Sequence, residues 1–123
     1  MDNQILVLKT VDDEGFDPEG IQMPPGGPVT APEWTQDHDI STGIKGSPYG
    51  NCLKSEWLDV NSKNWIVVRV ESCENNFQKL EENLVKFNSG HVVFSGDLYS
   101  AKNYIEDRVK NDEHLDLTHV MEV

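Results

Sequence analysis

The sequence predicts an α+β domain: a small, mostly antiparallel sheet with one clear helix in the C-terminal half of the chain and long loops rich in proline and glycine. Two aliphatic, β-branched runs, at residues 4–11 and 64–71, have the composition of strands. Residues 97–110 have the start signal and the apolar spacing of a helix. Residues 20–34 contain four prolines and three glycines, which exclude both a helix and a central strand.

The expected strands differ in their surroundings. Residues 4–11 begin with an uninterrupted apolar run, which is typical of a strand buried on both faces. Residues 64–71 alternate, and their purely aliphatic face is expected to meet the core. A third strand is expected at 91–95, after a turn signal at 88–90. The apolar spacing within 77–87 fits either one amphipathic helix or two short strands.

The helix is expected to begin after Asp97, whose side chain suits both the N-cap position and the positive helix end. Arg108 and Lys110 lie in the last turn, where cations are favoured. The apolar stripe consists of Leu98, Ala101, Tyr104, Ile105 and Val109. Residues 111–123 are expected to form either a final strand or a tail that orders on a partner.

The chain length of 123 residues predicts a single domain over residues 1–123. Within it, residues 12–34 are expected to be an acidic, Pro/Gly-rich loop region, extended and solvated. The glycine-rich stretch 42–50 is interpreted as turns. Apolar residues at helical intervals indicate a short helix around 51–59.

The sequence also restricts the compartment. No apolar run approaches the roughly 20 residues that span a bilayer, and the polar, acidic start does not resemble a signal peptide. We therefore expect a cytoplasmic protein without membrane contact. Cys52 and Cys73 lack metal-type spacing, and in the cytoplasm two reduced thiols are expected rather than a disulfide.

The charge is strongly and unevenly acidic. The net charge is −12, and residues 1–39 contain nine acids but only one base, Lys9. This field repels nucleic-acid phosphates and anionic membranes, and it favours a partner with a basic surface. The acids expected to form a partner-binding surface are Asp12, Asp13, Glu14, Asp17, Glu19, Glu33, Asp37 and Asp39. Solubility alone would also explain such a charge.

Patterns that indicate catalysis or metal binding are weak. His91 follows a glycine and has no identifiable nucleophile beside it. His114 and His119 share neither a helix face nor a strand face, and His38 is distant, so a zinc site lacks its spacing. Gly15 comes too early for a calcium loop, and the glycine-rich stretch departs from a phosphate-binding loop. We expect no catalytic residue, no metal and no cofactor.

Several segments occur in a recognisable order. They are Leu8 to Val11, Gly27 to Trp34, Gly43 to Gly46, Trp65 to Val70, Val85 to Phe87 and Gly90 to Asp97, followed by Ala101, Tyr104 and Ile105. In this order, over roughly residues 5–106, the chain resembles a family of short uncharacterised proteins encoded by bacteriophages and bacteria, some of them associated with pentapeptide-repeat proteins. The chain departs from the family pattern at Lys45, Tyr49 and Leu98, where the family has histidine, tryptophan and arginine. The resemblance implies a phage-type origin and no particular mechanism.

Two functions follow as hypotheses. The first is an acidic phage-type accessory protein that binds and modulates a host protein with a basic surface, such as a defence or nucleic-acid-processing factor. The second is a small-molecule or anion-binding protein, or a degenerate enzyme, with a pocket near the 43–50 turn; its expected lining is Lys45, Tyr49, Trp57 and Trp65. A self-associating module that uses residues 115–123 is a third alternative.

Overall fold

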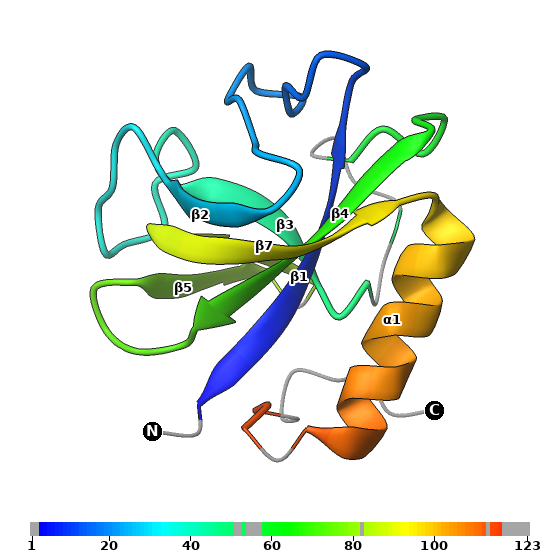
Figure 1. Cartoon of the computed structure of the whole chain (residues 1–123). Coiled ribbons are helices and arrows are strands. Elements are labelled where there is room, and N and C mark those ends of the chain that lie inside the picture. Colours follow the sequence, from blue (N-terminus) through cyan, green and yellow to red (C-terminus); the bar gives the residue numbers. More distant parts are fainter. Residues whose placement is uncertain (1–2, 51–52, 54–57, 82, 113, 117–123) are drawn as a thin grey trace.

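The computed structural model describes residues 3–50, 53, 58–81, 83–112 and 114–116, and it contains one seven-stranded sheet and one helix (Figure 1). The strands are β1 (Gln4–Val11), β2 (Gly27–Thr30), β3 (Ile44–Pro48), β4 (Asn64–Glu71), β5 (Phe77–Glu81), β6 (Leu84–Phe87) and β7 (Ser89–Gly96); the helix is α1 (Leu98–Asn111). The sheet order is β2-β7-β4-β1-β3-β6-β5, and every strand pair is antiparallel. The predicted α+β class and its antiparallel sheet are therefore confirmed.

The centre of the sheet is the pair formed by β1 and β4. They pair along their whole length, from Gln4 opposite Glu71 to Val11 opposite Asn64. Seven of the eight residues of β1 are buried, as the uninterrupted apolar run predicts. The aliphatic residues of β4 are also buried, so these two strands supply much of the core.

Helix α1 packs against β4 and β7 and lies along one side of the sheet (Figure 1). The side chain of Asp97 accepts a hydrogen bond from the Ser100 amide at 2.7 Å, which confirms the predicted N-cap. Ala101 and Ile105 are buried under the helix, and the Tyr104 ring stacks on Phe94 at 5.3 Å. No helix among the described residues is long and apolar enough to cross a membrane.

The expectation of turns at 42–50 was wrong, because Ile44–Pro48 forms β3, which lies between β1 and β6. A Cβ on Gly46 would lie 2.4 Å from Cγ1 of Val7 and 2.9 Å from the Leu8 carbonyl oxygen. The glycine is thus needed for β3 to approach β1 so closely. A glycine that signals a turn and one that permits close strand packing cannot be told apart by composition.

The structure also decides two open expectations. Residues 77–87 contain two short strands, β5 and β6, rather than a helix. Leu115 forms a single parallel bridge with Gln4, while the rest of the expected C-terminal strand lies outside the described residues. Most of the expected 51–59 helix also lies outside them.

Candidate functional site

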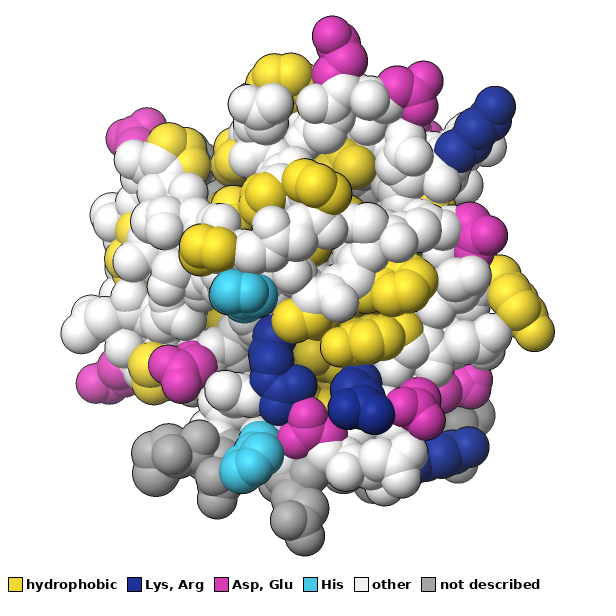
Figure 2. Space-filling view, viewed as in Figure 1, with side chains coloured by type: hydrophobic (Ala, Val, Ile, Leu, Met, Phe, Trp, Pro, Cys, Tyr) yellow, Lys and Arg dark blue, Asp and Glu magenta, His cyan; other side chains and the backbone are white. Residues whose placement is uncertain are grey.

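A groove of about 760 Å³ lies between the loop that follows β1, the proline-rich segment around β2, and one end of β4 and β7. Its floor is formed by apolar side chains that are almost fully buried: Met23, Val29 and Ile66. Its walls include Pro24, Pro25 and Pro28. Figure 2 shows hydrophobic side chains gathered over this part of the molecule.

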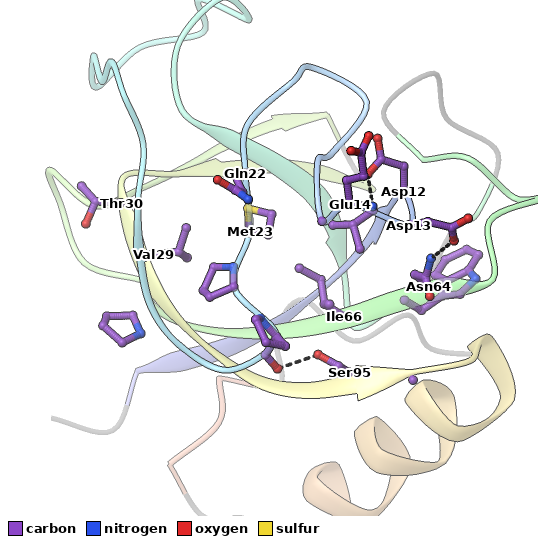
Figure 3. A pocket seen from close by; sticks show the side chains of 17 residues that line it. Asp12, Asp13, Glu14, Gln22, Met23, Val29, Thr30, Asn64, Ile66 and Ser95 are labelled. Atoms are coloured by element: carbon purple, nitrogen blue, oxygen red, sulfur yellow. Dashed lines mark hydrogen bonds between the residues drawn. The ribbon is translucent and has the colours of Figure 1, made fainter.

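One end of the groove is acidic. Asp12, Asp13 and Glu14 are exposed and line it, and Figure 3 shows the Asp12 and Glu14 carboxylates next to each other above the apolar side chains. Oδ1 of Asp12 accepts hydrogen bonds from the Glu14 amide at 2.8 Å and the Phe16 amide at 2.9 Å, which fixes the turn. Among the described residues, no basic side chain forms an ion pair with these three acids.

The groove walls are held by a few specific hydrogen bonds. The Met23 amide donates to the Gly15 carbonyl at 2.7 Å, which joins the two sides of the loop. The Ser95 hydroxyl donates to the Pro25 carbonyl at 2.6 Å and ties the proline segment to β7. Nδ2 of Asn64 donates to Asp13 Oδ1 at 2.8 Å. The side-chain donors of Ser95 and Asn64 are therefore used by acceptors of the groove itself.

Beneath the acidic loop lies an unusual group of buried lysines. Lys9 on β1, Lys45 on β3 and Lys86 on β6 are each 1% exposed or less. Lys9 forms an ion pair with Asp17 at 3.1 Å, and Lys45 forms one with Glu19 at 3.0 Å. Lysine is almost never fully buried unless it is paired, so these contacts are what allows the burial.

Lys86 is held by the second long loop, residues 33–43. Its ammonium donates to the Asp39 carbonyl and to the Thr42 hydroxyl, both at 2.8 Å, and lies 3.4 Å from Asp37. It also lies 5.1 Å from the centre of the Trp34 ring, within the range of a cation–π contact. The buried lysines thus fasten both acidic loops to the sheet.

The structure divides the predicted acidic surface into two groups. The residues that it exposes are Asp12, Asp13, Glu14, Glu19, Glu33, Asp37 and Asp39. Asp17 does not belong to this surface, because it is only 5% exposed and pairs with Lys9. Residues 12–22 are therefore not simply a solvated loop. Lysines within apolar strands were the sequence signal for buried partners, and it was missed.

The residues of the second predicted pocket do not gather around a cavity open to an anion. Lys45 is buried and its ammonium pairs with Glu19, so an anion would have to displace that carboxylate. Tyr49 is also buried; its hydroxyl donates to the Asp116 carbonyl at 2.8 Å. Trp65 is buried and lines the groove beside β2 instead. Trp57 lies outside the described residues.

The comparisons with known proteins give one limited similarity. The chain is 28% identical over 102 residues to an ice nucleation protein of Xanthomonas campestris pv. translucens, a match that covers 83% of this chain. The chain spans only 6% of the length of that protein. No family model matches the chain, and no solved structure matches it.

Proposed function

We propose that this chain is an acidic accessory protein that binds a partner protein with a basic surface. The observation that carries the proposal is the set of exposed carboxylates on Asp12, Asp13 and Glu14, which line an apolar groove without a basic side chain paired to them in the described structure. Exposed charge and adjacent apolar surface together are typical of interaction sites.

The distribution of the basic residues supports the same function. Three of the ten lysines and arginines are buried, and their ammonium groups are directed to carboxylates and carbonyls of the chain itself. These cations are unavailable to a ligand in solution. A basic partner therefore meets a surface whose field is negative, and such fields raise association rates by about 10- to 1,000-fold at low salt.

The resemblance to phage and bacterial proteins makes a host factor the proposed partner. A host protein that handles nucleic acid, including one used in defence, presents basic grooves to phosphates. An acidic protein could compete for such a groove. In this proposal the acidic chain modulates its partner by occupying that surface and needs no catalytic group of its own.

The test is a pull-down from host lysate with tagged protein, eluted by a salt gradient, followed by affinity measurement on the captured protein. The expected partner has a basic surface, and its affinity falls steeply with salt, because exposed charges are screened beyond about 8 Å at physiological ionic strength. The triple variant Asp13→Asn, Glu14→Gln, Glu33→Gln is expected to weaken binding and flatten the salt dependence.

The control variant is Glu71→Gln, Glu74→Gln, Glu106→Gln, which removes the same charge from exposed positions elsewhere. It is expected to weaken binding much less than the first triple variant does. An affinity that is unchanged from low to high salt would exclude the proposed function. Equal losses in the two triple variants would show that net charge acts without a localised surface.

A further inference from the structure

The groove is specific enough to define the segment that it takes, and the inference rests on the proposed function. We propose that the groove binds an extended segment of the basic partner in which arginine side chains alternate with aliphatic ones. The arginine contacts the Asp12, Asp13 and Glu14 end, and the aliphatic side chains contact Met23, Val29 and Ile66.

The first argument is the division of the groove into an apolar part and an acidic part. Binding sites for organic ligands and peptide side chains typically combine apolar walls with a few polar groups that fix orientation, and about 760 Å³ lies within their usual range of about 300–1,000 Å³. The floor residues Met23, Val29 and Ile66 are already fixed in the core and are at most 7% exposed. An apolar side chain placed on them loses its water contact without reorganising the protein.

The second argument is the balance of donors and acceptors. The polar lining offers the carboxylates of Asp12, Asp13 and Glu14, while Asn64 and Ser95 donate to Asp13 and Pro25. Prolines contribute carbonyl acceptors but no amide donors. A lining rich in acceptors complements a ligand rich in donors and disfavours a phosphate or a carboxylate.

The third argument selects arginine over lysine. The Asp12 and Glu14 carboxylates lie next to each other (Figure 3), and the Glu14 carboxylate makes no hydrogen bond within the described part of the chain. A guanidinium presents five donors in a planar fork and can contact two carboxylates at once, whereas an ammonium acts as a compact charge. Arginine is also the less strongly hydrated cation, so it loses less on entering the groove.

The fourth argument concerns the backbone of the segment. Strand β2 lies at the end of the sheet order, which leaves one edge without a strand partner among the described residues. However, Pro28 interrupts its amides, so β2 offers an incomplete ladder to an added strand. The segment is therefore held mainly by its side chains, and its sequence matters more than its backbone conformation.

The experiment is a titration of isotope-labelled protein followed by NMR, with three synthetic hexapeptides as probes. They are acetyl-(Arg-Leu)₃-amide, acetyl-(Gln-Leu)₃-amide, which lacks the charge, and acetyl-(Arg-Ser)₃-amide, which lacks the apolar side chains. The first is expected to bind tightest and to shift the methyl signals of Met23, Val29 and Ile66. Each control peptide is expected to bind roughly tenfold more weakly or worse.

A pair of conservative variants tests the acidic end. Glu14→Gln is expected to weaken (Arg-Leu)₃ binding by about two- to fivefold, the range for one exposed ion pair. Glu33→Gln, which removes an exposed acid outside the groove, is expected to leave it unchanged. Both replacements are isosteric on exposed side chains, so the fold should be retained.

The outcomes separate this inference from the function beneath it. If (Arg-Leu)₃ binds but shifts only signals near Glu33, Asp37 and Asp39, the groove inference fails and the acidic-surface function stands. If (Gln-Leu)₃ binds as tightly as (Arg-Leu)₃, the arginine assignment fails. If no arginine peptide binds at millimolar concentration while the pull-down captures a salt-sensitive partner, the groove is excluded and the partner is bound elsewhere.

Discussion

The ammonium nitrogen of Lys9 lies 3.1 Å from Oδ2 of Asp17, and the two side chains are only 1% and 0% exposed. Lys9 also donates to the carbonyl oxygen of Lys45, so one ammonium joins β1, β3 and the loop that follows β1. Burial lowers the pKa of Lys9, an effect that the Asp17 carboxylate opposes. This pair fixes the loop that carries the acidic end of the groove.

Removing either charge alone is expected to destabilise the fold strongly. Asp17→Asn leaves the Lys9 ammonium without its carboxylate, and Lys9→Met leaves the Asp17 carboxylate without its ammonium. Each change is expected to lower the free energy of unfolding by about 3–5 kcal/mol, the usual cost of an uncompensated buried charge. Oδ1 of Asp17 accepts from the Glu19 and Ile21 amides, and asparagine preserves that acceptor.

The double variant Lys9→Met, Asp17→Asn is expected to cost clearly less than the sum of the two single changes, because it leaves no unpaired buried charge. Urea denaturation of the four proteins measures this coupling. The control is Asp37→Asn: Asp37 is 57% exposed, and Lys86 keeps its bonds to Asp39 and Thr42. Additive costs at Lys9 and Asp17 would show that the pair does not act as a unit.

Gly46→Ala is expected to destabilise the sheet by about 1–3 kcal/mol or more, since the added methyl group would lie 2.4 Å from Cγ1 of Val7. The matched control is Gly26→Ala, where the nearest atom, the Val92 carbonyl oxygen, lies 3.9 Å from the added Cβ. Denaturation midpoints compare the two. A Gly46→Ala protein as stable as Gly26→Ala would mean that β3 does not need a glycine there.

The regular elements could be predicted because their local signals and their burial agree. The apolar start of residues 4–11 predicts a central strand, and β1 is one. Asp97 and the spacing that follows it predict α1. By contrast, β3 contains Gly46 and ends at Pro48, so its place in the sheet depends on contacts with Val7 and Leu8, which no local pattern encodes.

The groove could be predicted only in part, for a similar reason. The acids at 12–14 were identifiable as exposed charge, and the prolines of 24–28 as an extended segment. Their juxtaposition depends on the Met23 to Gly15 hydrogen bond and on the pairing of β2 with β7. The burial of Asp17 depends on Lys9, eight residues earlier in the chain, and charge counts do not distinguish a buried acid from an exposed one.

The N-cap of α1 gives a prediction about acid stability. The hydrogen bond from the Ser100 amide lowers the pKa of Asp97, so this carboxylate contributes stability above its ordinary pKa of about 4 and loses it as the pH falls through the lowered value. Asp97→Asn keeps a capping oxygen and should match the original protein near pH 7. Below about pH 4 its melting temperature should fall less steeply.

Asp97→Ala is the companion variant, because it removes the cap at every pH. It is expected to lower the melting temperature by a few degrees at neutral pH, and circular dichroism at 222 nm follows the loss of helix. The cap assignment fails if Asp97→Asn and Asp97→Ala lose the same stability at pH 7.

The phenol of Tyr49 gives the corresponding prediction at alkaline pH. Burial raises the pKa of this group, and the negative charge of Asp116 raises it further. The unfolded chain releases the proton at about pH 10 while the folded protein retains it. The contribution of Tyr49 to stability is therefore complete below about pH 10 and is lost as the pH rises above that value.

Tyr49→Phe isolates this effect by comparison with the original protein. Near pH 7 the variant loses the hydrogen bond to the Asp116 carbonyl, which is expected to cost about 1 kcal/mol. Above pH 10 its stability should fall less steeply than that of the original protein. The comparison is needed because the lowered pKa of Lys9 acts in the opposite direction, and stability gained there would mask part of the loss.

Absorbance at 295 nm tests the same assignment directly in the folded protein. Tyr99 is 77% exposed and should ionise near its ordinary pKa, while Tyr49 should ionise only at higher pH or when the protein unfolds. The part of the absorbance change that is delayed in the original protein should be absent in Tyr49→Phe. If all tyrosines of the folded protein ionised together near pH 10, the burial of Tyr49 between β1 and the segment around Asp116 would be contradicted.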